Sequence, residues 1–348
     1  MRMRRWRTMA AVSAAVACLG FVVACGGDDD DNAGAASDTT AAATSDTTVG
    51  LVSDVGKFND RSFNQSALEG LERAEAELGV DGTPIESAAA SDYIPNLTSL
   101  ARKDTSLTVG VGFLMADAMN TVATQFPDKN FAIVDYPWEA LKNKPPNVRG
   151  LTFATNENSY LVGYMAAKMV QKQGGKQIIS AVGGQKIPTV TIFIAGYTAG
   201  AKAANPDVQV LVDYSQEFVQ QAPCKELALD QIAKGSQAVF QVAGGCGLGA
   251  LSAAADKNVW GIGVDRDQSD LGPHILTSAV KRVDTSVYDS IKAVQDGTFK
   301  GGEDATFNQA NNGVSLGKVS PEVPQDILNE VDDLKQQIID GKITVPSQ

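Results

Sequence analysis

The sequence predicts an α/β protein made of two similar lobes, each built on a doubly wound parallel β-sheet with helices on both faces. The chain has 348 residues, which is too long for one ordinary domain but enough for two lobes with real cores. Strand-like apolar runs alternate with amphipathic helical runs, as in Thr48–Ser53 followed by Ser62–Leu78, and the alternation restarts at Gln177. A third observation, an internal repeat, indicates that the two lobes are alike.

The repeat relates the second half of the chain to the first at an offset of 130 residues, which falls to 128 where Tyr160 matches Tyr288. A simpler alternative is that any two α/β stretches share periodic Gly, Ala and Val. That alternative accounts less easily for the Phe and Asp pairs. The pairs at offset 130 are Phe63 and Phe193, Gly70 and Gly200, Ala74 and Ala204, Val80 and Val210, Val109 and Val239, and Asp135 and Asp265.

The N-terminus is typical of an export signal. Residues 1–8 are basic, and the apolar run at 9–24 suits a signal-peptide core but is short for a membrane-spanning helix. The run ends at Cys25, in a Val-Val-Ala-Cys segment that resembles a bacterial lipobox. We therefore expect residues 1–24 to be a lipoprotein signal peptide, Cys25 to be lipidated, and the polar residues 25–47 to be a flexible tether. The alternative is an ordinary secretory signal that happens to end in Cys.

Composition excludes several classes of function. The formal net charge is -12, although four Arg residues lie within residues 1–8, so nucleic-acid binding is not expected. The chain has one histidine, His274, which weighs against a His-based metal site or a Ser-His-Asp triad. Cys224 and Cys246 remain apart from the N-terminal cysteines, and an exported compartment permits a disulfide between them. The alternative is two buried free thiols.

Candidate ligand contacts lie where strand-like runs end. Asp54, Asp135 and Asp265 each end such a run, and open parallel sheets bind ligands beyond the carboxyl ends of their strands. Phe63 and Phe193 each open a helix after the first strand of a lobe, so the two rings are expected to face one another and clamp a flat ligand. The alternative is that both rings are ordinary helix–sheet core contacts.

At these residues the sequence resembles the basic membrane protein family, which includes purine-nucleoside-binding lipoproteins that are substrate-binding components of ABC transporters. The resemblance covers roughly residues 48–345. Its motifs are Asp54, Gly56, Asp60, Ser62, Phe63, Asn64, Ser66 and Gly70, then Phe193–Gly200, Gly244–Gly249, Gly263–Gln268 and Thr277–Arg282.

The resemblance implies a type I periplasmic-binding-protein fold with a three-segment hinge. The expected N-terminal lobe is 48–150 plus about 279–314, and the expected C-terminal lobe is 151–278 plus about 315–345. The implied protein is a monomer without a cofactor, anchored to the cell membrane only through its lipid and facing outside the cytoplasm. It passes a nucleoside, most of all a purine nucleoside, to an ABC transporter permease.

The resemblance also implies the ligand contacts. Phe63 and Phe193 sandwich the base, Asp54 and Asp135 read its edge, and Asp265 holds ribose hydroxyls with Lys281 and the Gly244–Gly247 backbone nearby. Departures from the family pattern leave the base preference open. Gly56-Lys57-Phe58 replaces a more usual Gly-Gly run and puts an extra ring near the cleft, and Cys246 stands where many members have Thr or another small residue. The full expected set is Asp54, Phe63, Asn64, Asp135, Phe193, Gly244, Gly245, Asp265 and Lys281.

An enzyme is the competing class. Residues Gly245–Ala250 match the dinucleotide fingerprint G-x-G-x-x-A, and Asp265 follows 20 residues after Gly245, as in an NAD-dependent oxidoreductase. The match lies in the second lobe of a chain that is expected to be exported and has a single His, so no enzyme is expected. A protein of the same fold that binds a sugar-like ligand, or acts as a ligand sensor, is a further alternative.

Overall fold

The computed structural model describes residues 46–348. The expected signal peptide 1–24, Cys25 and nearly all of the expected tether 25–47 lie outside the described residues and stay predictions. Within residues 46–348, no helix combines the length and the apolar character needed to cross a membrane.

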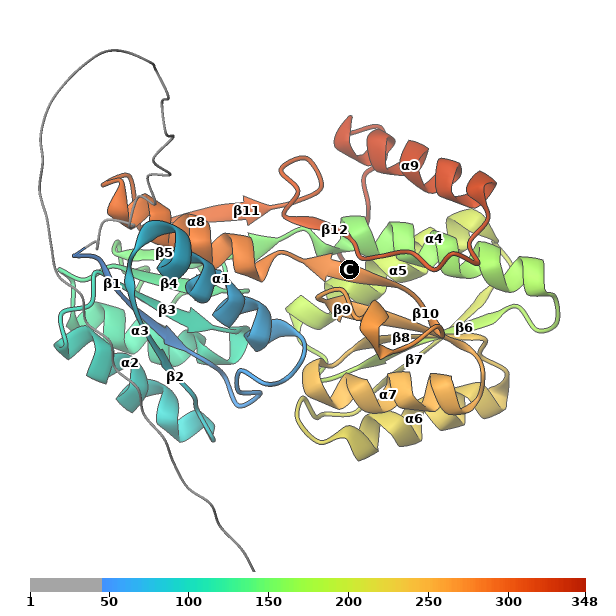
Figure 1. The fold of residues 1–348 in the computed structure, drawn as a ribbon, viewed down its shortest axis with the longest axis horizontal. Helices are drawn as coiled ribbons and strands as arrows, with labels where there is room; N and C mark the ends of the chain where they lie inside the picture. The colour runs from blue at the N-terminus through green and yellow to red at the C-terminus, as the bar shows by residue number, and fades with distance from the viewer. Residues whose placement is uncertain (1–45) are drawn as a thin grey trace, which may run out of the picture. The chain divides into compact units, whose positions relative to one another are not determined.

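The N-terminal lobe is a six-stranded, fully parallel sheet with strand order β11-β5-β4-β3-β1-β2. Two helices cover each face, α1 with α8 and α2 with α3 (Figure 1). The strands are β1 Thr48–Val52, β2 Asp81–Ile85, β3 Leu107–Val111, β4 Phe131–Val134, β5 Val148–Phe153 and β11 Glu303–Phe307; the helices are α1 Phe63–Leu78, α2 Tyr93–Arg102, α3 Ala116–Gln125 and α8 Val283–Gln295.

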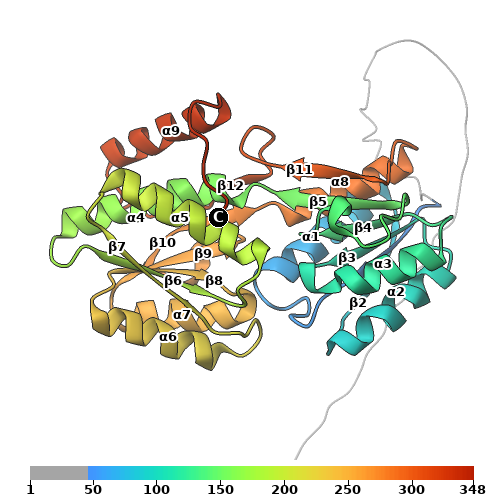
Figure 2. The ribbon, with the colours of Figure 1, turned by 180° about the vertical axis from the view of Figure 1, so that it is seen from behind.

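The C-terminal lobe repeats this plan with strand order β12-β10-β9-β8-β6-β7, in which only the edge strand β12 is antiparallel (Figure 2). Helices α4 and α5 cover one face, α6 and α7 the other, and α9 packs on α4. The strands are β6 Ile178–Gly183, β7 Gln209–Tyr214, β8 Ala238–Val242, β9 Trp260–Asp265, β10 Ile275–Lys281 and β12 Val314–Leu316; the helices are α4 Thr155–Gln173, α5 Pro188–Ala204, α6 Gln221–Lys234, α7 Gly244–Asp256 and α9 Gln325–Ile339. Short 3₁₀ segments lie at Ala90–Asp92, Phe113–Met115, Trp138–Ala140 and Ser269–Leu271.

The predicted fold class and internal repeat are confirmed. The order β5-β4-β3-β1-β2 in one sheet matches β10-β9-β8-β6-β7 in the other. Asp135 follows β4 and Asp265 ends β9, and both adopt a left-handed backbone, with φ of 66° and 63°. Asp tolerates this conformation better than most residues, which is consistent with its use at both strand ends.

Glycines allow the same helix pairing in both lobes. A Cβ at Gly70 on α1 would lie 2.3 Å from the carbonyl oxygen of Asp284 on α8, and one at Gly200 on α5 would lie 1.8 Å from that of Tyr160 on α4. In each lobe, the helix after the first strand therefore packs directly on the backbone of the helix through which the chain enters from the other lobe's sheet.

The chain crosses between the two sheets three times, after β5, after β10 and between β11 and β12. The strands extend slightly beyond the expected lobe boundaries. Strand β5 pairs with β11 as far as Phe153 and Phe307, whose rings stack with centroids 5.1 Å apart, so the first crossing follows residue 153 rather than 150. Strand β10 likewise stays in the second sheet as far as Lys281, which pairs with Val314 of β12, rather than 278.

Candidate ligand-binding cleft

A cavity lies between the carboxyl ends of the two sets of strands, where the sequence predicted a ligand site. Eight of the nine expected ligand residues line it, and the exception is Gly245. The N-terminal lobe contributes Asp54, Gly56, Asp60, Phe63, Asn64, Gly112, Phe113, Leu114 and Asp135, and the C-terminal lobe contributes Ile187, Thr189, Val190, Phe193, Phe218, Val242, Ala243, Gly244, Val264, Asp265 and Lys281.

The segment after β1 forms the polar wall of the cavity. Oδ1 of Asp54 accepts hydrogen bonds from the backbone N–H of Gly56 and from Nδ2 of Asn64, both at 2.8 Å. Oδ1 of Asn64 in turn accepts the backbone N–H of Asp54 at 3.2 Å, so the two side chains hold one another. Burial raises the pKa of Asp54 to about 6, although these hydrogen bonds oppose the shift.

Asp60 fixes the start of α1, and the sequence reasoning gave it no role of its own. Its carboxylate accepts the backbone N–H groups of Ser62 at 2.9 Å, Asn64 at 2.9 Å and Gln65 at 3.1 Å. These are N–H groups that a helix leaves unpaired at its N-terminus, so Asp60 acts as a cap and sets where Phe63 and Asn64 lie. An Asp two to three residues before a helical run is a capping signal that could have been read from the sequence.

Two polar contacts between the lobes lie in the cavity wall. The ammonium of Lys281 pairs with Oδ2 of Asp135, and both side chains are almost fully buried. Oδ2 of Asp265 accepts the hydroxyl of Ser62 at 2.7 Å. Burial raises the pKa of Asp135 against the opposing effect of Lys281, and it raises the pKa of Asp265 to about 6.

Phe63 and Phe193 approach the same point from opposite lobes. Nζ of Lys281 lies 4.7 Å from the ring centroid of Phe63, 5.7 Å from that of Phe193 and 5.0 Å from that of Phe153. Phe193 also packs edge-on against Phe240, with centroids 6.3 Å apart, and is only 2% exposed. Phe193 therefore has both a cleft contact and the core contact that the alternative predicted.

The expectation that Phe193 opens a helix is wrong. Helix α5 begins at Pro188, whose restricted φ favours the first helical position, so Phe193 lies in the second turn. The extra ring of Phe58, which the sequence places near the cleft, is buried in the N-terminal core and does not line the cavity.

The glycine-rich segment that resembles a dinucleotide fingerprint is helical. Helix α7 begins at Gly244, which has φ of 55° and lines the cavity, whereas Gly245 does not line it. A Cβ at Gly247 would lie 1.8 Å from Oε1 of Gln241, and one at Gly249 would lie 2.0 Å from the carbonyl oxygen of Gln221. These glycines let α7 pack closely on its neighbours, which explains the pattern without a bound dinucleotide.

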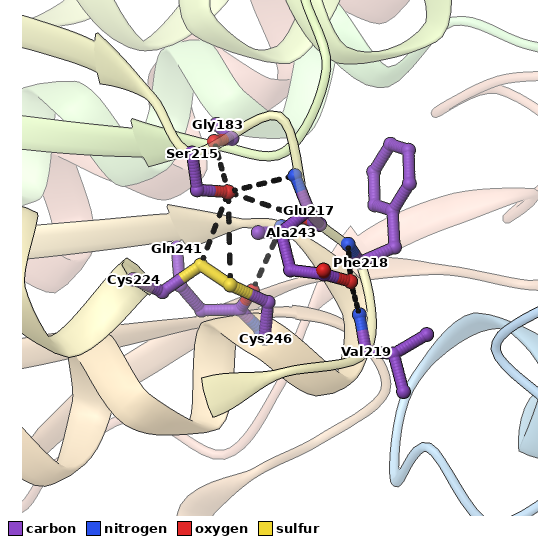
Figure 3. Close-up of a disulfide and its surroundings, with 9 residues drawn as sticks. All are labelled: Gly183, Ser215, Glu217, Phe218, Val219, Cys224, Gln241, Ala243 and Cys246. Carbon is purple, nitrogen blue, oxygen red and sulfur yellow. Dashed lines mark hydrogen bonds between the residues drawn. A yellow bond between two sulfur atoms is a disulfide. The ribbon is translucent and has the colours of Figure 1, made fainter. Parts of the chain in front are cut away.

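The predicted disulfide is present, and the alternative of two free thiols is wrong. Cys224 in the first turn of α6 is bonded to Cys246 in the first turn of α7, with Cα atoms 5.7 Å apart (Figure 3). Beside it, Phe218 from the β7–α6 loop lines the cavity. Sequence reasoning missed Phe218, because loop residues carry no periodicity that would show which way they point.

Comparison with known proteins identifies the family. Residues 47–348 match the family described as ABC transporter substrate-binding protein PnrA-like. The chain is 37% identical, over 98% of its length and 99% of the other, to the ABC transporter nucleoside-binding protein BmpA of Lactococcus lactis. It is 35% identical, over the same shares, to the CD4+ T-cell-stimulating antigen of Listeria monocytogenes.

Solved structures agree with this assignment. An ABC transporter solute-binding protein from Aeropyrum pernix matches with a TM-score of 0.78 at 28% identity, over 87% of this chain and 94% of that one. Three observations support the same family: the two lobes, the cavity between their strand ends, and the family match over residues 47–348. The chain belongs to the PnrA-like family of ABC transporter substrate-binding proteins.

Proposed function

We propose that this protein captures a nucleoside, most of all a purine nucleoside, by closing its lobes on it, and delivers it to an ABC importer. One observation carries the proposal: the rings of Phe63 and Phe193 and carboxylates of both lobes converge on one cavity. The carboxylates include those of Asp54, Asp135 and Asp265. The name of the Lactococcus relative, a nucleoside-binding protein, supports the same ligand class.

The chemistry of the cavity suits a flat base joined to a diol. Phe63 and Phe193, one from each lobe, offer apolar rings whose centroids lie 4.7 and 5.7 Å from the Lys281 ammonium. Each ring stacked on a base contributes roughly 1–3 kcal/mol. A purine in the cavity would contact a ring of each lobe, so the ligand itself would join the lobes.

The three carboxylates supply hydrogen-bond acceptors. Asp54 uses Oδ1 for its internal contacts, while Asp135 and Asp265 use Oδ2. The other oxygen of each accepts no hydrogen bond from residues 46–348, which leaves it available to a ligand. Ionised carboxylates only accept hydrogen bonds, so they suit the N–H groups of a base edge and the two hydroxyls of a ribose.

Contacts outside the cavity support capture by closure. Arg266 of the C-terminal lobe makes a two-pronged contact with Glu69 on α1, with Nε–Oε2 at 3.1 Å and Nη2–Oε1 at 2.5 Å. Nε2 of Gln268 donates to the carbonyl oxygen of Arg61 at 3.0 Å. Such contacts require the lobes to be close, so a ligand that bridges the lobes would shift the population toward this arrangement.

The cavity is complete within one chain, so we infer that a monomer suffices and that no covalent chemistry or cofactor takes part. We also infer that the protein is held at the outer face of the cell membrane through lipid on Cys25. A relative from Pyrococcus horikoshii that is 35% identical is named a lipoprotein.

Calorimetric titration tests the ligand class. Guanosine, inosine and adenosine are expected to bind, and free ribose to bind far more weakly, because it lacks the ring that Phe63 and Phe193 grip. Phe63→Ala is expected to weaken nucleoside binding about tenfold or more. Phe299→Ala, which removes a ring packed on Arg149 away from the cavity, is the matched control. Tight binding of a sugar but of no nucleoside would overturn the proposal.

A further inference from the structure

We propose that the Cys224–Cys246 disulfide positions Phe218 as a further aromatic wall of the ligand cleft, so that breaking the bond lowers ligand affinity as well as stability. The identity of the ligand rests on the function proposed above, whereas the positioning of Phe218 does not. Phe218 comes from the loop between β7 and α6 and lines the same cavity as Phe193 and Gly244.

The disulfide lies against the loop that carries Phe218. Oγ of Ser215 is 3.4 Å from Sγ of Cys224 and 3.6 Å from Sγ of Cys246 (Figure 3). The same oxygen is 3.3 Å from the carbonyl oxygen of Gly183, at the end of β6, and 3.1 Å from that of Glu217. Both cysteines are fully buried. The disulfide therefore joins the first turns of α6 and α7 and packs against Ser215 in the loop between β7 and α6.

The backbone of Phe218 is held on both sides. Its carbonyl oxygen accepts the N–H of Cys246 at 3.0 Å. Its own N–H donates to Oε1 of Glu217 at 2.9 Å, and the N–H of Val219 donates to the same oxygen at 2.7 Å (Figure 3). The residue that forms the disulfide thus also bonds directly to the backbone of the residue that lines the cleft.

The ring of Phe218 fits a space that glycine provides. A Cβ at Gly184 would lie 2.2 Å from Cε1 of Phe218, so the ring packs directly on the backbone after β6. On the other side, Cβ atoms at Gly244 and Gly245 would lie 3.4 and 3.3 Å from the Phe218 carbonyl oxygen. A shift of the first turn of α7 would therefore displace Phe218, and the disulfide prevents that shift.

A double-mutant cycle separates positioning from general stability. Guanosine affinity is measured by calorimetry well below the unfolding temperature for the parent, Cys224→Ser/Cys246→Ser, Phe218→Ala and the triple variant. Each of the first two changes is expected to weaken binding about tenfold, as for loss of one stacking contact. The triple variant is expected to bind no more weakly than Phe218→Ala alone, because the disulfide acts through that ring. Val219→Ala, at an exposed neighbour that does not line the cavity, is the control and should bind as the parent does.

Two results would overturn the proposal. Unchanged affinity in the folded double-cysteine variant would leave the disulfide a purely stabilising bond, and fully additive losses in the triple variant would show that it does not act through Phe218. If the double-cysteine variant does not fold, Ser215→Ala is used in its place. This variant keeps the disulfide and removes the hydroxyl that lies between the disulfide and the loop carrying Phe218.

A second readout needs no ligand. Amide hydrogen exchange at Cys246, whose N–H donates to the carbonyl oxygen of Phe218, is expected to speed up in the ligand-free Cys224→Ser variant, which breaks the disulfide and keeps Cys246. Exchange at the matching first turn of α3 in the other lobe should not change. Unaltered exchange at Cys246 would refute the positioning role even if guanosine fails to bind the parent, a result that would contradict only the nucleoside assignment.

Discussion

The two lobes share one topology but hold their walls of the cleft in different ways. In the N-terminal lobe the segment after β1 is polar, and the carboxylates of Asp54 and Asp60 order it through hydrogen bonds to Gly56, Asn64 and the start of α1. In the C-terminal lobe, Val190 and Phe193 on α5 and Phe218 before α6 form an apolar part of the wall, and packing and the disulfide between α6 and α7 hold it instead. The two lobes therefore share a topology but differ in what holds the cleft wall in place: hydrogen bonds in one lobe, and apolar packing with a disulfide in the other.

The two matched rings offer the strongest way to break this comparison. Phe193→Ala is expected to lower the free energy of unfolding by about 3–5 kcal/mol, because the ring is buried against Phe240 as well as lining the cleft. Phe63→Ala removes a half-buried ring and should lower it by less than half as much. Chemical denaturation of both variants measures the difference. Equal losses of unfolding free energy in the two variants would show that the two rings are equally well packed in the core.

The Asp60 cap is the next test. Asp60→Ala is expected to lower the free energy of unfolding by about 1–2 kcal/mol, since three N–H groups at the start of α1 lose their acceptor. Ligand affinity should fall too, because Phe63 and Asn64 depend on that turn. Asp92→Ala removes a comparable acceptor, for the N–H groups of Ala88 and Ala89, away from the cleft. It should affect stability alone; loss of affinity there would argue against a local role for Asp60.

Acid is expected to weaken ligand binding. The pKa values of Asp54 and Asp265 are raised to about 6 in the ligand-free protein, and donors on a ligand favour the ionised form. Affinity should therefore be constant above about pH 7 and fall below pH 6, by up to roughly tenfold per pH unit for each group.

The stability of the ligand-free fold depends on pH in the opposite direction to ligand affinity. Because these folded-state pKa values lie above the unfolded ones, the two groups stabilise the ligand-free fold below the unfolded value of 3.8, and that contribution is lost as the pH rises through about 6.

The predicted effect of acid on ligand binding is measured by titrations between pH 5 and 8. Asp265→Asn should bind more weakly at pH 7 with a flatter pH profile, and tighter binding in acid would contradict this account.

The smallest expected effect concerns the ion pair between the lobes. Glu69→Gln should weaken ligand binding by less than about fivefold, since Arg266 and Glu69 are partly exposed and such pairs contribute up to about 1 kcal/mol. The charge exchange Glu69→Arg/Arg266→Glu should restore part of the loss. Glu77→Gln breaks a pair within α1 and should leave affinity unchanged. If the exchange restores nothing, the contact does not contribute to closure.

Sequence periodicity was sufficient for the fold, because strand–helix alternation and the repeat at Asp135 and Asp265 both depend on local chemistry. Periodicity was a less reliable guide to helix starts and to the roles of single residues, because tertiary packing determines both. Pro188 starts α5 earlier than the repeat implies, which moves Phe193 into the second turn. Gly247 and Gly249 serve helix packing that only the fold reveals. Phe218 lies in a loop, and its place in the cleft depends on a disulfide between two helices.

The small molecule carried by the purified protein tests the central claim most directly. The protein would be purified without added ligand and denatured, and the released molecules would be identified by mass spectrometry, with Phe63→Ala treated in parallel. We expect a nucleoside from the parent in close to equimolar amount and much less from the variant. Release of a sugar, a peptide or a dinucleotide at that stoichiometry would contradict capture of a nucleoside between the two lobes.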